Sequence, residues 1–401
     1  MKFGLIKERK TPPDHRAVLS PRACQKVVSQ FPQAEIRVEP SPIRVFSDEE
    51  YLQAGIEVSE DMASCDVLLG VKEVPVDALI PERKYFFFSH TIKKQPYNRP
   101  LLRAVLEKKI ELYDHELLTD PKGVRLVAFG RYAGIVGAYN GFRAYGLKHG
   151  GFSLPKAREL KDQQALIARL KKVELPPIKI LLTGRGRVGS GAREMLDGIG
   201  MRHVTVADYL QKEFNEPVYC QIDASEYNKR KDGVRGSKAD FMANPGEYRS
   251  DFFRFARVTD LYIAGHFYGQ GAPYLFTRED ARHPEFRISV VADISCDIDG
   301  PVACTLRPST IADPVYGYDP QTEKETDYRN PGAIAVMAVD NLPASLPRDA
   351  TEGFGAAFVK HIIPAFFDGD ADGILERARM TRGGRLTPRY AYLQDYVEGK
   401  E

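Results

Sequence analysis

A glycine-rich turn in the middle of the chain constrains its fold more than any other feature. The apolar run 178–183 leads directly into Gly184-Arg-Gly-Arg-Val-Gly189, and a helix-like stretch follows. The first glycine allows the tight turn, the second lets the backbone approach a pyrophosphate, and the third lets helix and strand pack closely. The N–H groups at the start of the helix would then face the anion. This pattern predicts a Rossmann-type dinucleotide site lined by Gly184, Gly186, Arg187, Val188 and Gly189.

A second apolar segment, residues 203–207, ends at Asp208. That acid lies near the spacing of about 20 residues at which Rossmann folds place a carboxylate on the ribose hydroxyls. An acid there would repel a 2′-phosphate, so Asp208 favours NAD as the cofactor. Arg185 and Arg187 in the turn could instead pair with that phosphate, which keeps NADP as the alternative.

Composition narrows the classes of protein and partner. A chain of 401 residues is too long for one ordinary core, so we expect two domains. A net charge of +2 gives no reason to expect nucleic acid or an anionic membrane as a partner. No apolar run approaches the ~18 residues of a membrane span, and the start does not resemble a secretory signal. The five cysteines are scattered without zinc-site spacing, so we expect no metal and a cytoplasmic location.

Strand and helix patterns alternate before the glycine turn, which indicates an α/β fold with parallel sheets. We expect two Rossmann-like domains with an active-site cleft between them. Residues 1–130 with 343–401 form a discontinuous catalytic domain, and residues 131–342 form the dinucleotide-binding domain. The polar stretch 213–251 is predicted to be a solvated insertion, with phosphate binding or capping of the cleft as the alternative.

Charged side chains follow several predicted strands of the first domain. Taken singly, each has an ordinary explanation as a solvated charge or a structural histidine. Their recurrence at the carboxyl ends of strands in one parallel sheet, where ligands bind, indicates a site. The residues concerned are Arg16, Lys72, Glu73, His90, Glu116 and Arg125.

Four strings of residues resemble one known family. They are Gly70-Val-Lys-Glu-Val-Pro, Phe88-Ser-His-Thr-Ile-Lys-Lys-Gln-Pro-Tyr-Asn, Val127-Ala-Phe-Gly-Arg-Tyr-Ala-Gly and Asp340-Asn-Leu-Pro-Ala-Ser-Leu-Pro-Arg-Asp-Ala-Thr-Glu. They are similar to the saccharopine dehydrogenase (L-lysine-forming) and lysine-ketoglutarate reductase family, within the alanine dehydrogenase and transhydrogenase superfamily. The resemblance covers about residues 1–367. The string that begins at Phe88 looks closer to the reductase half of the bifunctional enzyme of animals and plants than to the fungal dehydrogenase. This resemblance favours NADP as the cofactor.

The resemblance implies a reversible hydride transfer. Saccharopine and an oxidised nicotinamide cofactor would yield lysine and 2-oxoglutarate through an imine. It further implies that Lys72 and His90 are the acid–base pair, which fits a reaction that deprotonates an amine, activates water and collapses a carbinolamine. Lysine acts as a base only when burial or a nearby cation lowers its pKa, whereas the carboxylate of Glu73 would raise it.

The same resemblance assigns further roles. Glu73 and Glu116 match acids that tune the site and its substrate contacts. Arg16, Arg125 and Lys93 match positions that hold substrate carboxylates, a task suited to the bidentate geometry of arginine. Asp340 matches an aspartate near the nicotinamide.

Two alternatives stay open. One is an alanine dehydrogenase-like amino-acid dehydrogenase, although Tyr97, Asn98, Glu116 and Arg125 favour the larger saccharopine. The other is a dinucleotide-binding protein that has lost catalysis, against which the presence of both Lys72 and His90 argues. The sequence is compatible with an oligomer and does not give its size.

Overall fold

The computed structural model describes residues 1–400, and the chain divides into two compact units. The first unit comprises Met1–Phe129 and Pro347–Glu401, and the second comprises Gly130–Leu346.

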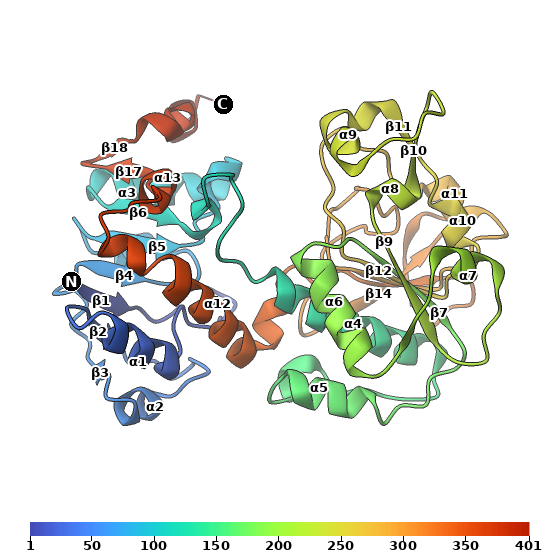
Figure 1. Ribbon diagram of the computed structural model, residues 1–401, viewed down its shortest axis with the longest axis horizontal. Helices are drawn as coiled ribbons and strands as arrows, with labels where there is room; N and C mark the ends of the chain where they lie inside the picture. Colours follow the sequence, from blue (N-terminus) through green and yellow to red (C-terminus); the bar gives the residue numbers. More distant parts are fainter. Residues whose placement is uncertain (401) are drawn as a thin grey trace. The chain divides into compact units, whose positions relative to one another are not determined.

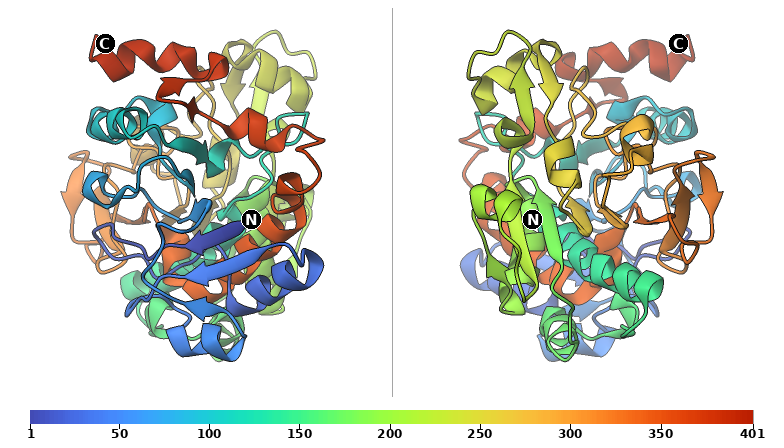
Figure 2. Two further views of the ribbon diagram at one scale, coloured as in Figure 1. Left: turned by 90° about the vertical axis from the view of Figure 1, so that its left-hand side faces the viewer. Right: turned by 90° about the vertical axis from the view of Figure 1, so that its right-hand side faces the viewer.

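The first unit is built on a six-stranded, wholly parallel sheet in the order β3-β2-β1-β4-β5-β6 (Figures 1 and 2). Its strands are β1 (Lys2–Leu5), β2 (Glu35–Val38), β3 (Glu57–Val58), β4 (Val67–Leu69), β5 (Lys84–Phe87) and β6 (Glu111–Asp114). The chain adds β2 and β3 on one side of β1, then crosses to place β4 on the other. This order makes the carboxyl ends of β1 and β4 the switch point where ligands bind in such sheets.

Short apolar runs account for these strands, because both faces of the sheet are covered. The central strands β4 and β5 are almost entirely buried, and Phe3 and Phe86 are fully buried. The helices are α1 (Pro21–Gln30), α2 (Asp48–Gln53), α3 (Arg99–Glu107), α12 (Pro347–His361), α13 (Ile374–Ala378) and α14 (Gln394–Glu398). Ser20 and Ser47 cap α1 and α2 through hydrogen bonds to backbone N–H groups.

The C-terminal segment completes the first unit. In α12, the Thr351 hydroxyl accepts a hydrogen bond from the backbone N–H of Ala17, and Gly355 brings this helix close to Val18. The hairpin β17 (Thr381–Arg382) and β18 (Arg385–Leu386) lies beside β6 and α3, as Figure 1 shows in red and cyan. Thr381 Oγ1 accepts from the N–H of Leu112 at 2.9 Å.

The second unit contains an eight-stranded sheet in the order β15-β14-β16-β13-β12-β7-β9-β8. The strands are β7 (Lys179–Thr183), β8 (Arg202–His203), β9 (Val218–Ile222), β12 (Leu261–Ala264), β13 (Val290–Asp293), β14 (Val315–Asp319), β15 (Lys324–Thr326) and β16 (Ile334–Met337). The expectation of a parallel sheet is wrong at one edge, because β14 runs antiparallel to both β16 and β15. The three are connected by short chain segments, which allow antiparallel pairing without a crossover helix.

The helices of this unit are α4 (Gly130–His149), α5 (Gln163–Leu170), α6 (Arg187–Gly198), α7 (Val206–Gln211), α8 (Ala224–Tyr227), α9 (Lys238–Ala243), α10 (Phe253–Ala256) and α11 (Arg278–Arg282). A separate antiparallel hairpin joins β10 (Asn228–Arg230) to β11 (Tyr248–Ser250). The long helix α4 packs on α6 and on β12, β13 and β16. Glycines permit this contact, since a Cβ on Gly134 would lie 2.0 Å from the carbonyl oxygen of Val188.

The expected strand at 203–207 is wrong. The strand β8 ends at His203, and Thr205 caps α7 by accepting a hydrogen bond from the N–H of Asp208 at 3.1 Å. A capping threonine three residues before an acid starts a helix, which ends the strand early.

The interpretation of 213–251 as a solvated insertion is also wrong in part. It contains β9, which is fully buried and lies next to β7 inside the sheet.

Candidate functional site

Lys72 and His90 are positioned by two neighbouring strands of the first unit. Strands β4 and β5 run parallel with Leu69 opposite Phe86, so the turns after them lie side by side. Two backbone hydrogen bonds connect the turns: Gly70 N–H donates to Phe86 at 2.9 Å, and Phe88 N–H donates to Val71 at 3.0 Å. The predicted grouping of these side chains at one edge of the sheet therefore has a simple backbone origin.

Glu73 joins His90 to a second cation. Its Oε1 lies 2.6 Å from Nδ1 of His90, and its Oε2 accepts a hydrogen bond from Nζ of Lys10 at 2.6 Å. Burial alone would raise the pKa of Glu73, but the hydrogen bonds from His90 and Lys10 outweigh it and lower that pKa to about 2. Glu73 is therefore a carboxylate at neutral pH, and it fixes the orientation of the imidazole.

The pKa of Lys72 is lowered, the direction of shift that would favour its neutral amine. Burial is the largest cause of its lowered pKa, and the positive charge of Arg16 adds to it. The carboxylates of Asp14 and Glu73 oppose that shift without cancelling it. The sequence left open whether burial or the neighbouring acid decides the pKa of Lys72, and the structure shows that burial does.

Glu8 holds the backbone of the Lys72 turn, a role that the sequence analysis missed. Its two carboxyl oxygens accept hydrogen bonds from the N–H groups of Val71, at 2.6 Å, and Lys72, at 2.9 Å. Burial raises the pKa of Glu8 to about 7, although these hydrogen bonds lower it. The available signal was an acid three residues beyond β1, the strand that pairs with β4.

His115 supports the same turn from β6. Its Nε2 lies 2.9 Å from the carbonyl oxygen of Gly70, and its ring packs against Phe88, Phe354 and Phe358. Burial lowers the pKa of His115 to about 4, so the ring is neutral and donates its N–H to that carbonyl. Sequence patterns alone do not distinguish this structural histidine from His90.

Arg16 is buried against Asp14 and an aromatic ring. Its guanidinium donates to the two Asp14 oxygens at 2.9 and 2.6 Å, and its Cζ lies 4.2 Å from the centre of the Phe129 ring. Burial alone would raise the pKa of Asp14, but the hydrogen bonds from Arg16 and its positive charge outweigh this effect and lower that pKa to about 2. This fixed cation lies near enough to Lys72 to act on its pKa.

The remaining predicted substrate residues differ in placement. Glu116 follows β6 and lies 3.5 Å from Arg125, whose side chain is 40% exposed. Lys93 is exposed in the turn after His90, and among residues 1–400 the ion-pair partners of Glu73 are Lys10 and His90, not Lys93. The structure thus brings Lys72, Glu73 and His90 together and leaves Lys93 at the surface.

The backbone at His90 is itself unusual. His90 has a φ of 55°, in the left-handed region that non-glycine residues seldom adopt. Such conformations persist only where the surroundings enforce them, and they cluster at functional sites. Here the enforcing contacts are the carboxylate of Glu73 and the backbone bond from Lys93 N–H to the His90 carbonyl oxygen.

In the second unit, the glycine turn has the geometry that a pyrophosphate needs. Gly184 has a φ of +92°, and a Cβ there would lie 2.4 Å from the carbonyl oxygen of Gly265. A Cβ on Gly189 would lie 2.0 Å from the Gly184 oxygen, whereas Gly186 faces open space. Gly186 is also the N-cap of the long helix α6 and contributes no side-chain cap. The first N–H groups of α6, beginning at Arg187 and Val188, are therefore suited to hold a phosphate.

The acid expected to bind the ribose does not occupy the predicted position. Asp208 lies in the first turn of α7 and pairs with Lys212 at 2.7 Å, and the strand that precedes this helix, β8, lies at the edge of the sheet. The strand next to β7 is β9, and the residue that follows it is Asp223. The assignment of Asp208 as the ribose-binding acid is therefore corrected, because the order of strands in the sheet places Asp223 beside the glycine turn. Asp340 follows β16 and is exposed.

No group of three or more His, Cys, Asp or Glu side chains among residues 1–400 is arranged to hold a metal ion. No helix in that range combines the length and apolar character needed to cross a membrane.

Comparisons with known proteins agree with this architecture. Residues 4–136 match the family model for the N-terminal domain of alanine dehydrogenase/PNT. The alpha-aminoadipic semialdehyde synthase of Mus musculus, a mitochondrial protein, is 29% identical over 97% of this chain. The chain spans only 47% of that relative's length, about half. The saccharopine dehydrogenase (NAD⁺, L-lysine-forming) of Yarrowia lipolytica is 24% identical, covering 90% of this chain and 92% of its own.

A solved structure supports the fold. An L-alanine dehydrogenase superposes with a TM-score of 0.67 at 20% identity, covering 100% of this chain and 99% of its own. This likeness establishes the two-domain, Rossmann-like arrangement of elements. Together with the family match over residues 4–136, it confirms the predicted resemblance: residues 4–136 match the N-terminal domain of alanine dehydrogenase/PNT, and nearly the whole chain is similar to saccharopine dehydrogenases and alpha-aminoadipic semialdehyde synthases.

Proposed function

We propose that the protein is an oxidoreductase that interconverts saccharopine with lysine and 2-oxoglutarate by using a nicotinamide dinucleotide. The observation that carries this proposal is the cluster of Lys72, Glu73 and His90 at the carboxyl ends of β4 and β5. It combines a lysine of lowered pKa with an imidazole fixed by a carboxylate. The relatives named saccharopine dehydrogenase support the choice of substrate.

The residues of the second unit fit the cofactor. The open space at Gly186 and the free N–H groups at the start of α6 suit a pyrophosphate. Close backbone packing around Gly184 and Gly189 holds the turn in its conformation. When bound, the nicotinamide accepts a hydride from a carbon atom or returns it. The other steps of the reaction fall to side chains of the first unit.

Proton transfer divides between two groups in this proposal. Lys72 takes the proton from the secondary amine of saccharopine, since its lowered pKa leaves more of the free amine at neutral pH. Loss of the hydride then gives an imine, which water attacks to form a carbinolamine. His90 accepts the proton from that water through Nε2, because Glu73 occupies Nδ1. Breakage of the C–N bond, with protonation of the leaving amine, releases lysine and 2-oxoglutarate.

Fixed cations suit the substrate, which carries three carboxylates. Arg16 and Arg125 offer planar guanidinium groups for bidentate contacts. Arg125 is partly exposed beside Glu116, and Arg16 is held rigidly by Asp14. The cytoplasmic location remains a prediction from the sequence.

The test is an assay of the purified full chain with NADH or NADPH, lysine and 2-oxoglutarate, followed by absorbance at the wavelength of the reduced nicotinamide. Oxidation that requires both lysine and 2-oxoglutarate is expected. Oxidation with pyruvate and ammonia instead would identify an alanine dehydrogenase-like enzyme. Nucleotide binding without turnover of any of these substrates would indicate a protein without this catalysis.

A further inference from the structure

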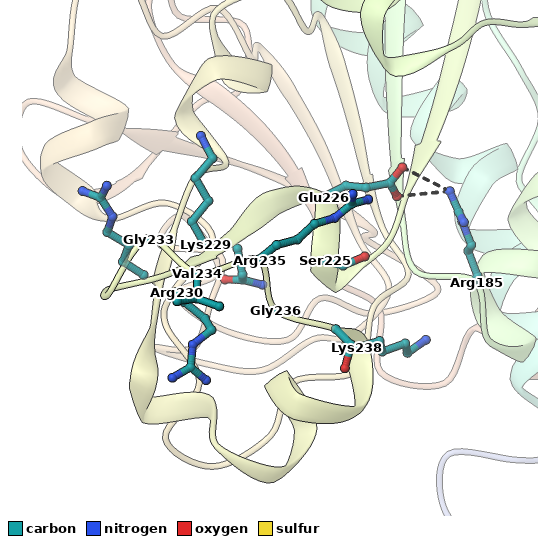
Figure 3. A pocket seen from close by; sticks show the side chains of 13 residues that line it. Arg185, Ser225, Glu226, Lys229, Arg230, Gly233, Val234, Arg235, Gly236 and Lys238 are labelled. Carbon is teal, nitrogen blue, oxygen red and sulfur yellow. Dashed lines mark hydrogen bonds and ion pairs between the residues drawn. The ribbon is translucent and has the colours of Figure 1, made fainter.

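The cavity beside the hairpin β10–β11 lies next to the glycine turn, whose Arg185 reaches toward Glu226 (Figure 3). It therefore belongs to the nucleotide site already proposed. A different feature, in the first unit, does not depend on the nucleotide. The C-terminal segment, residues 379–396, contacts the loop 90–98, which begins at His90.

The loop 90–98 needs support from its surroundings. It consists mainly of two 3₁₀ turns, Thr91–Lys93 and Pro96–Asn98, and turns this short are not stable by themselves. His90 and Lys94 both have a φ of 55°, in the left-handed region. Such a conformation is unfavourable for a residue with a Cβ and persists only where neighbouring contacts enforce it. The loop therefore depends on fixed points outside it.

The first fixed point lies on either side of His90. Ser89 and Thr91 are fully buried, and their hydroxyl oxygens lie 2.7 Å apart. Asp114, which ends β6, accepts hydrogen bonds from the N–H of Ser89 at 2.9 Å and from its hydroxyl at 2.5 Å. From the C-terminal segment, Sδ of Met380 lies 3.9 Å from Oγ1 of Thr91. The two neighbours of His90 are thus held between β6 and the C-terminal segment.

The second fixed point is Gln95, just before the second turn of the loop. The hydroxyl of Tyr396 donates a hydrogen bond to the carbonyl oxygen of Gln95 at 2.6 Å. Tyr396 is fully buried, and Cζ of Arg99 lies 5.1 Å from the centre of its ring. Tyr396 and Met380 belong to the same hydrophobic core, which includes Leu102 of α3. The loop is therefore anchored to the core of the unit, although Gln95 itself is exposed.

The C-terminal segment is itself attached to the edge of the sheet. The N–H of Met380 donates to the carbonyl oxygen of Leu112 at 2.8 Å, and Thr381 Oγ1 donates to that of Ile110 at 2.7 Å. Because β6 is the last strand in the sheet, this attachment gives the segment a fixed position beside it. The segment can therefore define where the loop lies relative to the strands.

We propose that the C-terminal segment positions the His90 loop for catalysis, with Tyr396 and Met380 as positioning residues. The proposal rests on the proposed function, because the loop carries the imidazole that exchanges a proton with the reacting water. Each residue acts on His90 through the backbone of the loop, Met380 at Thr91 and Tyr396 at Gln95. Their effect falls on turnover and not on nucleotide binding, since the glycine turn belongs to the second unit.

The decisive variant is Tyr396→Phe, which removes the hydroxyl and leaves the ring in the core. We expect kcat/KM for 2-oxoglutarate to fall about tenfold, because a misplaced catalytic group loses much of its effect, while the Kd of the nucleotide stays unchanged. In a His90→Ala background the same substitution should lower the residual activity by less than about twofold, since the two changes then act through one group. Hydrogen exchange of the amides in residues 91–98 should become faster.

The matched control is Tyr51→Phe. Tyr51 is also fully buried, and its hydroxyl donates to the carbonyl oxygen of Leu19 at 2.7 Å. It lies in α2 beside β3, at the opposite edge of the same sheet. In urea unfolding it should lose about as much stability as Tyr396→Phe, whereas its kcat/KM and the exchange of residues 91–98 should match those of the unaltered chain.

Met380→Ala should lower kcat/KM as well, although it opens a cavity in the core. If that variant does not fold, Tyr396→Phe decides the test because it keeps the core filled. Activity and exchange in Tyr396→Phe equal to those of Tyr51→Phe, or a full further loss in the His90→Ala background, would overturn the positioning role and leave the proposed function standing. Absence of turnover by the unaltered chain would overturn the proposed function and this assignment with it.

Discussion

Nδ1 of His90 lies 2.6 Å from one carboxylate oxygen of Glu73, and the other oxygen accepts a hydrogen bond from Lys10. Glu73 acts on both neighbouring groups of the site. It orients the imidazole of His90, and its negative charge, with that of Asp14, opposes the lowering of the Lys72 pKa by burial and Arg16. Two groups able to move protons are thereby placed at one edge of the sheet around one carboxylate.

Lys72→Met should lower turnover far more than cofactor affinity. The substitution keeps the length of the side chain but removes the amine that takes the substrate proton. Loss of a general base typically costs 10²–10⁴-fold in rate, so we expect kcat to fall by about 100-fold or more. Steady-state kinetics, combined with direct nucleotide titration, measure the two effects. Equal losses in turnover and affinity would contradict a catalytic role for Lys72.

Glu73→Gln should flatten the acid limb of the stability curve. The pKa of Glu73 is lowered from 4.5 to about 2, so its carboxylate contributes stability above pH 4.5. That contribution, up to about 3 kcal/mol, is lost as the pH falls through 2. Thermal unfolding midpoints between pH 2 and 6 should converge for the two proteins at the acid end. Parallel curves would show that Glu73 is not linked to folding in this way.

The sequence predicted most strands of the first unit because each is a short apolar run in a sheet covered on both faces. The apolar runs at residues 65–71 and 85–89, for instance, overlap β4 and β5, and Lys72 and His90 directly follow these runs. The same rule failed at Asp208, where Thr205 caps a helix and outweighs the apolar pattern of 203–207.

Contacts between residues far apart in the chain could not be predicted from the sequence. Nothing near Glu8 shows that its oxygens receive two N–H groups from a turn more than 60 residues away. Likewise, spacing along the chain cannot show that β9 rather than β8 pairs with β7, since this depends on the order of strands in the sheet. Local patterns therefore located the catalytic candidates, and topology was needed to find the acid beside the glycine turn.

Glu8→Gln should remove a loss of stability that sets in toward neutral pH. Burial raises the pKa of Glu8 from 4.5 to about 7, so its contribution to stability is fully present below pH 4.5. That contribution, about 3 kcal/mol, is lost as the pH rises through 7 because the buried carboxyl must ionise. The glutamine cannot ionise, although its NH₂ group would face one of the two backbone donors and cost about 1–3 kcal/mol at every pH.

Urea unfolding of both proteins from pH 4.5 to 8 tests this prediction. The variant should be less stable at pH 4.5, and the difference should shrink toward pH 8. Glu8→Gln should also reduce turnover, since it loosens the turn that carries Lys72. A difference in stability that does not change with pH would contradict the raised pKa.

Two alanine substitutions in the glycine turn should separate folding from nucleotide binding. Gly189→Ala places a Cβ about 2.0 Å from the carbonyl oxygen of Gly184, a backbone contact that no side-chain rotation relieves. We expect it to destabilise the second unit by at least about 3 kcal/mol and to abolish nucleotide binding.

In Gly186→Ala, the new Cβ meets no atom within 4 Å, and the φ of −78° at residue 186 suits alanine. This substitution should therefore lower the free energy of unfolding by less than about 1 kcal/mol. Its methyl group would nevertheless occupy the face on which the phosphates approach, so NADPH and NADH affinities should both fall at least tenfold. Thermal unfolding and calorimetric titration of the two variants distinguish these outcomes, and unchanged nucleotide affinity in Gly186→Ala would show that the pyrophosphate does not bind at this turn.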